Sequence, residues 1–235
     1  SDVCSSDLSC APAPVFDVII KDFRLHNPTS AIKGQESSEY WIGINDGSIA
    51  EIIDITQHTL LPKGKEEISL DGQHLYPGFI DAHGHSDYTL LVDARAVSQI
   101  SQGVTTEVIG NCGHGCEPLT DDIGRFAGNI YGYDGSVELS WRTTAQYLEK
   151  LRKAQPAINV FPLTPAGNLR RAVVANRDGQ TEDASSIERA QMLRLIEEAM
   201  AAGSNGISFG LEYRQEEIGR AHAELQSPDH LVCRL

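Results

Sequence analysis

Two histidines separated by a single glycine have the spacing of metal ligands. His83 and His85 directly follow a short apolar segment, residues 77–82 (PGFIDA), which favours a β-strand. Alternate residues of a strand point to the same side, so both imidazole rings should project together from the strand end. Neutral imidazole is a good zinc ligand. The spacing therefore predicts a metal site at the end of this strand, although an HxH pair alone also arises often by chance.

A cysteine offers a third ligand. Residues 104–109 (VTTEVI) predict a second buried strand, and Cys112 follows it in the glycine-rich loop 110–116. Cysteine thiolate also binds zinc. We expect Cys112 to face the same point as the two histidines, because the tips of neighbouring strands lie at one edge of a sheet. This second signal makes a chance HxH pair less plausible.

Other polar residues lie close to these ligands in the sequence. Asp81 and Asp87 flank the histidine pair, and we expect them to accept hydrogen bonds that orient an imidazole ring. Cys116 forms a CxxxC pattern with Cys112 and flanks His114, an arrangement that also suits a second zinc site. A loop thiol without metal is the simpler interpretation, and we favour it.

The chain from residue 78 onward alternates between predicted strands and helices. This alternation is typical of a parallel α/β sheet or barrel, and barrel enzymes carry their active sites where the strands end. Capping boxes of the types T-x-x-Q and S-x-x-E begin the two clearest helices. The elements predicted after the first strand and its histidines are a helix at 93–102, the strand at 104–109, a helix opened by Thr143 that runs through Lys153, a strand at 157–163, a helix at 185–202 and a strand at 205–211.

The predicted helix at 185–202 has the strongest pattern in the chain. Its apolar residues recur at helical spacing, and Gly203 is placed to end it. Residues 117–137, by contrast, are polar and rich in glycine, so we expect an active-site loop there. The apolar stripe of the helix is predicted to consist of Ile187, Ala190, Leu193, Ile196 and Met200.

Residues 9–76 predict a small β unit ahead of the main domain. Strands are expected at 16–25, 40–44 and 48–55, with an Asn-Asp-Gly hairpin turn between the last two. Residues 56–67 break the strand pattern with a proline and a glycine. A unit of this size holds little core of its own. We therefore expect it to be part of a β-sandwich that packs on something larger.

Composition limits the kinds of partner. The chain carries a formal net charge of −14, which argues against nucleic-acid binding, because that requires a basic surface. Its sequence has no apolar run that approaches the roughly 18 residues a membrane-spanning helix needs. The cysteines are too few and too unevenly spaced for a disulfide framework. A small soluble molecule is therefore the expected partner.

Both ends of the chain resemble foreign sequence. Back-translation of residues 1–8 (SDVCSSDL) and of residues 217–235 gives DNA similar to a common short-read sequencing adaptor. We therefore expect natural sequence only between these ends, divided into the β unit at 9–76 and an α/β domain at 77–216. His222 is accordingly not counted as a ligand. Because four strand and helix steps cannot close a barrel, we expect the natural protein to be cut near its middle.

Three segments together resemble a known family. Residues 77–87 (PGFIDAHGHSD), 102–113 (QGVTTEVIGNCG) and 206–213 (GISFGLEY) are similar to the N-acyl-D-amino-acid deacylase, or D-aminoacylase, branch of the amidohydrolase superfamily. HxH alone indicates only the superfamily. HxH followed by Asn-Cys-Gly after the second strand is much more specific.

The resemblance implies a zinc-dependent amidohydrolase that cleaves the amide bond of small N-acyl-D-amino acids. The implied fold is α/β: the first half of a (β/α)8 TIM-like barrel, with N-terminal strands of a small β-sandwich. In the family, the histidines matching His83 and His85 bind one metal, and the cysteine matching Cys112 holds a tightly bound zinc with two later histidines. A late aspartate is the general acid/base. These later residues have no counterpart here, so the chain itself is expected to be inactive. Tyr213 falls where the family has a tyrosine near the substrate.

Two other functions remain open at this point. Hydrolases of cyclic amides, such as hydantoinases and dihydroorotases, commonly use a carboxylated lysine on the fourth strand, and this chain has no lysine after Lys153. Cys112 provides another anionic ligand, which favours the linear-amide enzymes. A non-catalytic metal-binding relative would share the first ligands and lack the later ones. Residues 165–168 (PAGN) also replace the Gly-His-Gly of relatives, which leaves the substrate preference open.

Overall fold

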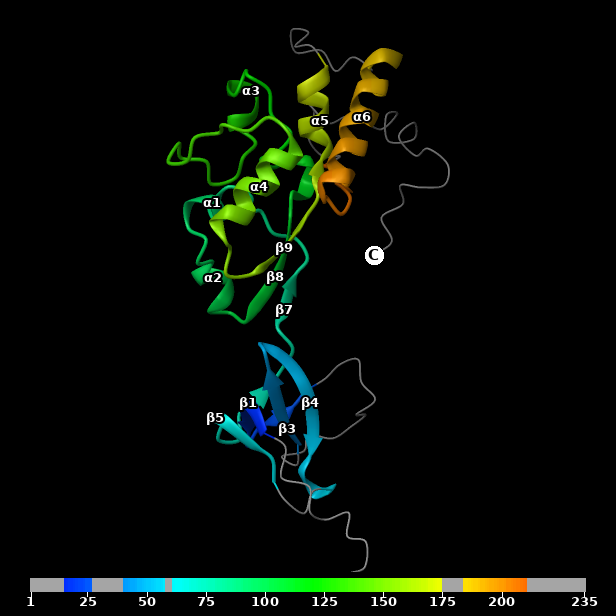
Figure 1. The fold of residues 1–235 in the computed structure, drawn as a ribbon. Helices are drawn as coiled ribbons and strands as arrows, with labels where there is room; N and C mark the ends of the chain where they lie inside the picture. The colour runs from blue at the N-terminus through cyan, green and yellow to red at the C-terminus, as the bar shows by residue number, and fades with distance from the viewer. Residues whose placement is uncertain (1–14, 27–39, 58–60, 175–183, 211–235) are drawn as a thin grey trace, which may run out of the picture. The chain divides into compact units, whose positions relative to one another are not determined.

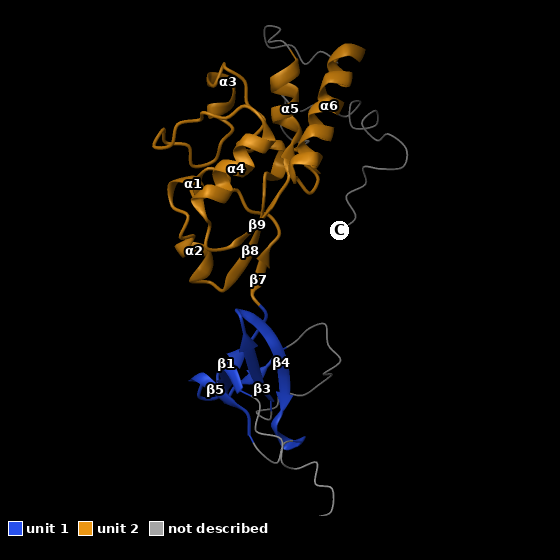
Figure 2. Cartoon of the chain, viewed as in Figure 1, with its two compact units in different colours: residues 1–77 blue, residues 78–235 orange. Residues whose placement is uncertain are grey.

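The computed structural model describes residues 15–26, 40–57, 61–174 and 184–210. Its chain divides into two compact units, Ser1–Pro77 and Gly78–Leu235, which Figure 2 colours blue and orange. The expected adaptor ends lie outside the described residues, and so does Tyr213.

Unit 1 is built on a four-stranded sheet in the order β4-β3-β1-β5 (Figure 1). Strand β1 pairs antiparallel with β3 and parallel with β5, and β3 and β4 form a hairpin. The hairpin turn at Asp46 and Gly47 has positive φ at both residues, as its sequence predicts. A second, parallel pair joins β2 to β6. The elements are β1 (Val15–Lys21), β2 (Arg24–Leu25), β3 (Tyr40–Asn45), β4 (Ser48–Asp54), the 3-10 turn η1 (Ile55–Gln57), β5 (Lys63–Ser69) and β6 (His74–Leu75).

Two predictions for unit 1 were wrong. The strand expected at 16–25 is interrupted at Asp22, whose φ of 58° cannot continue a strand. Residues 63–67 were expected to be irregular, yet they belong to β5, which pairs with β1 along its whole length. Their sequence, KGKEE, has poor strand propensity, so the pairing rather than the local sequence determines this strand.

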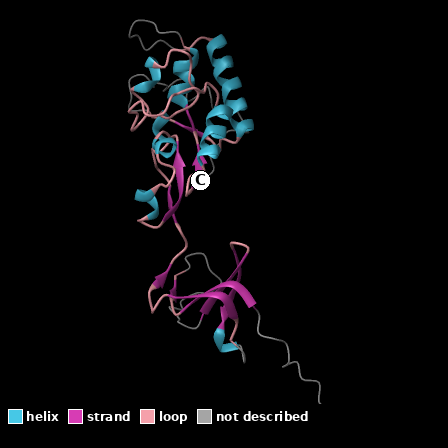
Figure 3. Ribbon diagram, turned by 60° about the vertical axis from the view of Figure 1, so that its left-hand side comes forward, coloured by secondary structure: helices cyan, strands magenta, loops and turns pink. Residues whose placement is uncertain are grey.

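Unit 2 contains a parallel three-stranded sheet in the order β7-β8-β9, formed by β7 (Phe79–Asp81), β8 (Val104–Ile109) and β9 (Asn159–Pro162). Helices connect these strands and lie beside the sheet, as Figures 1 and 3 show. The short strands β10 (Thr164–Pro165) and β11 (Ile207–Ser208) also pair in parallel. Unit 2 therefore has the α/β architecture expected from the alternating sequence pattern.

The two capping boxes lie where the sequence predicts them. The Thr143 hydroxyl accepts from the backbone of Gln146, and Ser185 accepts in the same way from Glu188. Gly203 ends the second of these helices with a φ of 112°. The helices of unit 2 are α1 (Thr89–Val92), α2 (Val97–Ile100), α3 (Gly124–Ala127), α4 (Thr144–Ala154), α5 (Ala166–Val173) and α6 (Ser186–Ala202), with the 3-10 turn η2 (Asn111–Gly113) after β8.

The segment 117–137 differs from the prediction. It contains α3 and contributes Leu119, Phe126 and Ile130 to the main core of unit 2. The polar residues and glycines between these side chains obscured their apolar spacing. These buried apolar side chains anchor the segment, so it is not a purely polar loop.

Helix predictions were also wrong in three details. The helix expected at 93–102 is confined to α2, while α1 and α5 were not predicted. The stripe on α6 was only partly correct, because Ile187 is 72% exposed. Helix α6 buries Ile196 as predicted, together with Met192 and Ala199, which the predicted stripe did not include, and its core cluster includes Leu169 of α5. Figure 1 shows α5 and α6 side by side. No helix in the described part of the chain is long and apolar enough to cross a membrane.

Candidate metal centre

The three predicted ligands come together in unit 2. The Nε2 atom of His83 lies 3.0 Å from the Sγ atom of Cys112. One ligand atom from each of His83, His85 and Cys112 lies within 4.8 Å of the others. The histidines follow β7 and the cysteine follows β8, and these strands are parallel neighbours in the sheet. Strand pairing therefore brings the ligands to one place.

The arrangement fits a zinc ion. Ligands of a tetrahedral zinc lie roughly 3.5 Å apart, given bond lengths of about 2.0 Å to nitrogen and 2.3 Å to sulfur. The Nδ1 atom of His85 is buried and has no hydrogen-bond partner among the described residues. Burial, followed by the neighbouring His83, lowers the pKa of His85, which favours the neutral imidazole that a metal requires. The residues present thus match the donor set of a zinc site.

A strand distant in sequence supports the loop that carries Cys112. This residue lies in η2 with a φ of 56°. The backbone N–H of Gly113 donates to Oγ of Ser208 at 3.0 Å, and that hydroxyl donates to the carbonyl oxygen of Gly110. Ser208 belongs to β11, so the fold uses a late strand to fix the conformation of the cysteine loop.

Asn111 ties the cysteine loop to the histidine segment. Its side-chain amide donates to the carbonyl oxygens of Gly84 at 3.0 Å and Val108 at 2.8 Å. Gly110 comes directly before it and has a φ of 77°. A Cβ atom on Gly110 would lie 2.0 Å from the carbonyl oxygen of Leu163. Only glycine fits where the backbone at residue 110 passes the backbone at Leu163.

A buried carboxylate lies behind the histidine pair. Glu107 of β8 is 1% exposed, and its oxygens accept from Ser86 Oγ at 2.7 Å and from Gln99 Nε2 at 3.0 Å. Gln99 also donates to Ser86 Oγ at 2.8 Å. Glu107 was not among the residues predicted for the site. The available signal was a single charged residue inside the apolar strand sequence VTTEVI.

The two flanking aspartates do not orient imidazole rings as expected. Asp81 accepts a hydrogen bond from the backbone N–H of His83 at 3.0 Å. Asp87 is buried, its carboxylate accepts from the backbone of Gly110, and burial raises its pKa to about 7. Both carboxylates therefore stabilise backbone next to the ligands, and within the described residues neither one hydrogen-bonds a ring of the pair.

The loop after Cys112 adds no second cluster of ligands. In the described part of the chain, His83, His85 and Cys112 form the one group of three or more potential metal ligands. Cys116 is fully buried, and burial raises the pKa of its thiol well above the usual value. This favours the interpretation of Cys116 as a thiol without metal.

An aromatic residue that was not predicted for the site lies beside the ligands. The ring of Tyr131 lies 4.3 Å from that of His85 and 6.0 Å from that of His114. Tyr131 is 46% exposed and belongs to the 117–137 segment, which also contains the buried Leu119. The 117–137 segment therefore reaches the metal centre. Tyr213, the expected substrate residue, cannot be placed because it lies outside the described residues.

Comparison with known proteins identifies similar sequences. The model of the amidohydrolase family matches residues 66–228. The chain is 38% identical over 151 residues to the N-acyl-D-aspartate deacylase of Alcaligenes xylosoxydans xylosoxydans, an alignment that covers 64% of this chain and 29% of that protein. It is 35% identical over 166 residues to the D-aminoacylase of the same organism, covering 71% of this chain and 32% of that protein. The chain thus spans about a third of the length of these relatives.

A solved structure has a similar fold. It is the crystal structure of the N-acyl-D-glutamate deacylase from Bordetella bronchiseptica, complexed with zinc and a phosphonate inhibitor that mimics the tetrahedral intermediate of the reaction. The TM-score is 0.72 at 30% sequence identity, and the match covers 89% of this chain and 41% of that chain.

Proposed function

The chain belongs to the amidohydrolase family, within the branch that holds the D-aminoacylases, and from this premise we propose that it supplies the first metal ligands of a zinc-dependent N-acyl-D-amino-acid deacylase. The observation that supports this function most directly is the convergence of His83, His85 and Cys112 within 4.8 Å. Two imidazoles and a thiolate match the nitrogen and sulfur ligands that zinc prefers.

The proposed fold follows from the same premise. The parallel sheet β7-β8-β9 with its helices is interpreted as the beginning of a (β/α)8 barrel, and the sheet of unit 1 as part of a β-sandwich. The position of the ligands beyond β7 and β8 supports this interpretation, because barrel enzymes place their chemistry at the strand ends.

The residues of this chain would prepare the site for amide hydrolysis. Zinc held there would lower the pKa of a water molecule and polarise the scissile carbonyl group. Cys112 contributes the anionic ligand, and burial lowers the pKa of His85, which favours the neutral form that binds metal. Asn111 and Ser208 hold the cysteine loop in place. We propose that the remaining histidines and the aspartate that moves the proton lie on sequence outside this chain, consistent with its coverage of about a third of its relatives.

A linear N-acylated D-amino acid is the preferred substrate class. The matched relatives are named N-acyl-D-aspartate deacylase, D-aminoacylase and N-acyl-D-glutamate deacylase. A cyclic-amide hydrolase is less well supported, because the chain has no lysine after Lys153 to serve as a carboxylated metal ligand. Cys112 offers the anionic ligand instead.

The test requires the gene as it occurs in the source DNA. The gene should be recovered beyond codon 216, and its purified product assayed with the N-acetyl derivatives of D-aspartate, D-glutamate and D-methionine. We expect hydrolysis of at least one of these, little hydrolysis of the L-enantiomers, and loss of activity after chelation. Hydrolysis of hydantoin or dihydroorotate without any deacylase activity would overturn the proposal. The 235-residue chain alone is expected to be inactive.

A further inference from the structure

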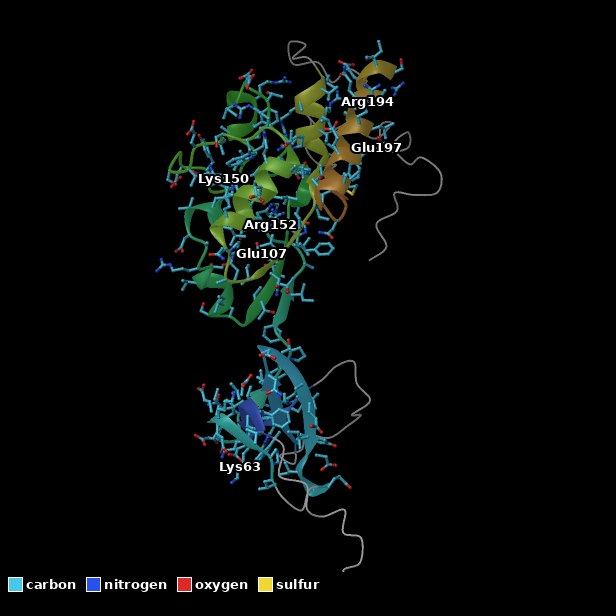
Figure 4. All side chains as sticks on the ribbon, in the orientation of Figure 1. Lys63, Glu107, Lys150, Arg152, Arg194 and Glu197 are labelled. Carbon is cyan, nitrogen blue, oxygen red and sulfur yellow. The ribbon has the colours of Figure 1, made fainter. Side chains whose placement is uncertain are left out.

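We propose that Glu107 is a positioning residue of the metal centre, which holds the His83-Gly84-His85 segment in its ligating conformation. This inference rests on the proposed zinc site. Glu107 does not belong to the ligand cluster formed by His83, His85 and Cys112. It therefore acts on the metal without binding it, through the groups that it contacts and through its charge. Figure 4 labels Glu107 within unit 2.

The burial of Glu107 needs compensation, and the structure supplies it. A carboxylate removed from water is costly unless hydrogen bonds replace its hydration. One oxygen accepts from Ser86 at 2.7 Å, and the other accepts from Gln99 at 3.0 Å. Ser86 directly follows His85 in the chain, and Gln99 belongs to α2. Glu107 therefore links strand β8 to helix α2 and to the segment that carries both histidines.

Glu107 also packs against the glycine between the two histidines. A Cβ atom on Gly84 would lie 1.9 Å from Oε1 of Glu107, so the carboxylate occupies the space beside this backbone. The N–H of Gly84 donates to the carbonyl oxygen of Val108 at 2.9 Å, and its carbonyl accepts from Asn111 at 3.0 Å. The peptide that separates the ligands is thus fixed by both hydrogen bonds and by the buried carboxylate.

The charge of Glu107 gives a second way to act on the site. Glu107 is close enough to His85 to interact with its ring electrostatically. A fixed negative charge near a divalent cation favours binding of that cation, especially where water is excluded. Outer residues that orient metal ligands typically change metal affinity by about 10- to 100-fold. Glu107→Gln tests the charge, and Glu107→Ala also removes the hydrogen bonds and the packing.

The experiment titrates the apo form of the protein encoded by the gene recovered beyond codon 216 with Co²⁺ and follows two absorption signals. The thiolate charge-transfer band reports ligation by a cysteine, and its loss in Cys112→Ala assigns it to Cys112; the visible d–d bands report coordination geometry. We expect Glu107→Gln to weaken Co²⁺ binding about tenfold and to change the d–d bands, with a larger loss for Glu107→Ala. Glu117→Gln is the matched control, because it alters another buried carboxyl group, whose hydroxyl contacts are Thr144 and Thr164. It should leave both signals unchanged.

A milder variant protects the test against misfolding. Gln99→Leu removes one donor to Glu107 from a half-buried helix position, and it should weaken Co²⁺ binding by a smaller factor. Far-ultraviolet circular dichroism identifies which variants fold. Wild-type affinity and wild-type d–d bands in the folded Glu107 variants, or in Gln99→Leu if those do not fold, would overturn the role of Glu107 alone. If the wild-type protein encoded by the recovered gene shows no thiolate band, the zinc site itself is overturned and the role of Glu107 with it.

Discussion

The Nε2 atom of His83 lies 3.0 Å from the Sγ atom of Cys112, although the two residues are 29 positions apart in the chain. Their proximity follows from the parallel pairing of β7 with β8, in which Asp81 lies opposite Glu107. Each ligand follows its strand by a few residues. A metal ion bound to both would therefore connect two strand ends, and its binding energy should add to the stability of unit 2.

Cys112→Ala should remove most of the zinc from the chain. The substitution deletes the one thiolate of the ligand cluster, so affinity should fall by more than the 10- to 100-fold typical for loss of an outer residue. Zinc content after dialysis and the zinc-induced shift in the unfolding midpoint measure this. Cys116→Ala is the control, because that thiol is buried outside the cluster. Full zinc content in Cys112→Ala would refute the ligand assignment.

Gly110→Ala should disrupt the cysteine loop. The new Cβ atom would lie 2.0 Å from the carbonyl oxygen of Leu163, at a φ of 77°. The left-handed conformation alone costs about 1–2 kcal/mol for a residue other than glycine, and the clash adds to it. Urea unfolding should show a loss of at least about 2 kcal/mol, together with weaker Co²⁺ binding. Gly128→Ala serves as the control, since its φ is −70° and its Cβ atom would meet open space. A normal unfolding midpoint for Gly110→Ala would contradict this account.

The sequence predicted those elements whose signals are local. Strand β8 has the predicted bounds, because its apolar sequence lies between a glycine and a glycine-rich loop. Helices α4 and α6 begin at their predicted caps because a capping box is a contact between residues three apart. The proximity of His83 and Cys112 was also predictable. It requires only that two strands consecutive in the sequence pair side by side, so that both strand ends lie at the same edge of the sheet.

Other features depend on partners distant in sequence and could not be predicted. Strand β5 forms despite poor strand propensity, because β1 provides its hydrogen-bond partners. Ile187 fits the helical stripe of α6 and is nevertheless exposed, because the helix packs through Met192 and Ile196. The contacts of Glu107 with Ser86 and Gln99 also require the folded chain.

Ser185→Ala should destabilise helix α6. The Ser185 hydroxyl accepts from the backbone N–H of Glu188 at 3.2 Å and completes a capping box. Loss of such a cap typically costs about 1 kcal/mol. The free energy of unfolding in urea should fall by this amount. Ser186→Ala changes the next serine, which lies inside the helix, and it should be close to neutral because alanine favours helix. Equal effects of the two substitutions would argue against the cap.

Glu117→Gln should reduce the loss of stability on raising the pH. Burial raises the pKa of Glu117 from 4.5 to about 8. Between these values the unfolded chain loses a proton that the folded chain keeps, so the free energy of unfolding falls as the pH rises. The slope for one such group is at most about 1.4 kcal/mol per pH unit. Glutamine cannot titrate. The free energy of unfolding of the variant should therefore increase steadily relative to that of the wild type from pH 5 to pH 8.

Urea unfolding at several pH values measures this effect. Trp141 is buried in the core of unit 2, so its fluorescence in a Trp41→Phe background reports the unit that contains Glu117. Burial also raises the pKa of Asp87, to about 7, so Asp87 too lowers the free energy of unfolding as the pH rises. A smaller pH dependence should therefore remain in both proteins. Thr144→Val removes a hydrogen bond that lowers the pKa of Glu117, so the pKa should rise further. The free energy of unfolding of this variant should therefore keep falling to a higher pH than that of the wild type. Parallel pH profiles for the wild type and Glu117→Gln would contradict a raised pKa of Glu117 in the folded state, because a group with the same pKa in both states adds no pH dependence.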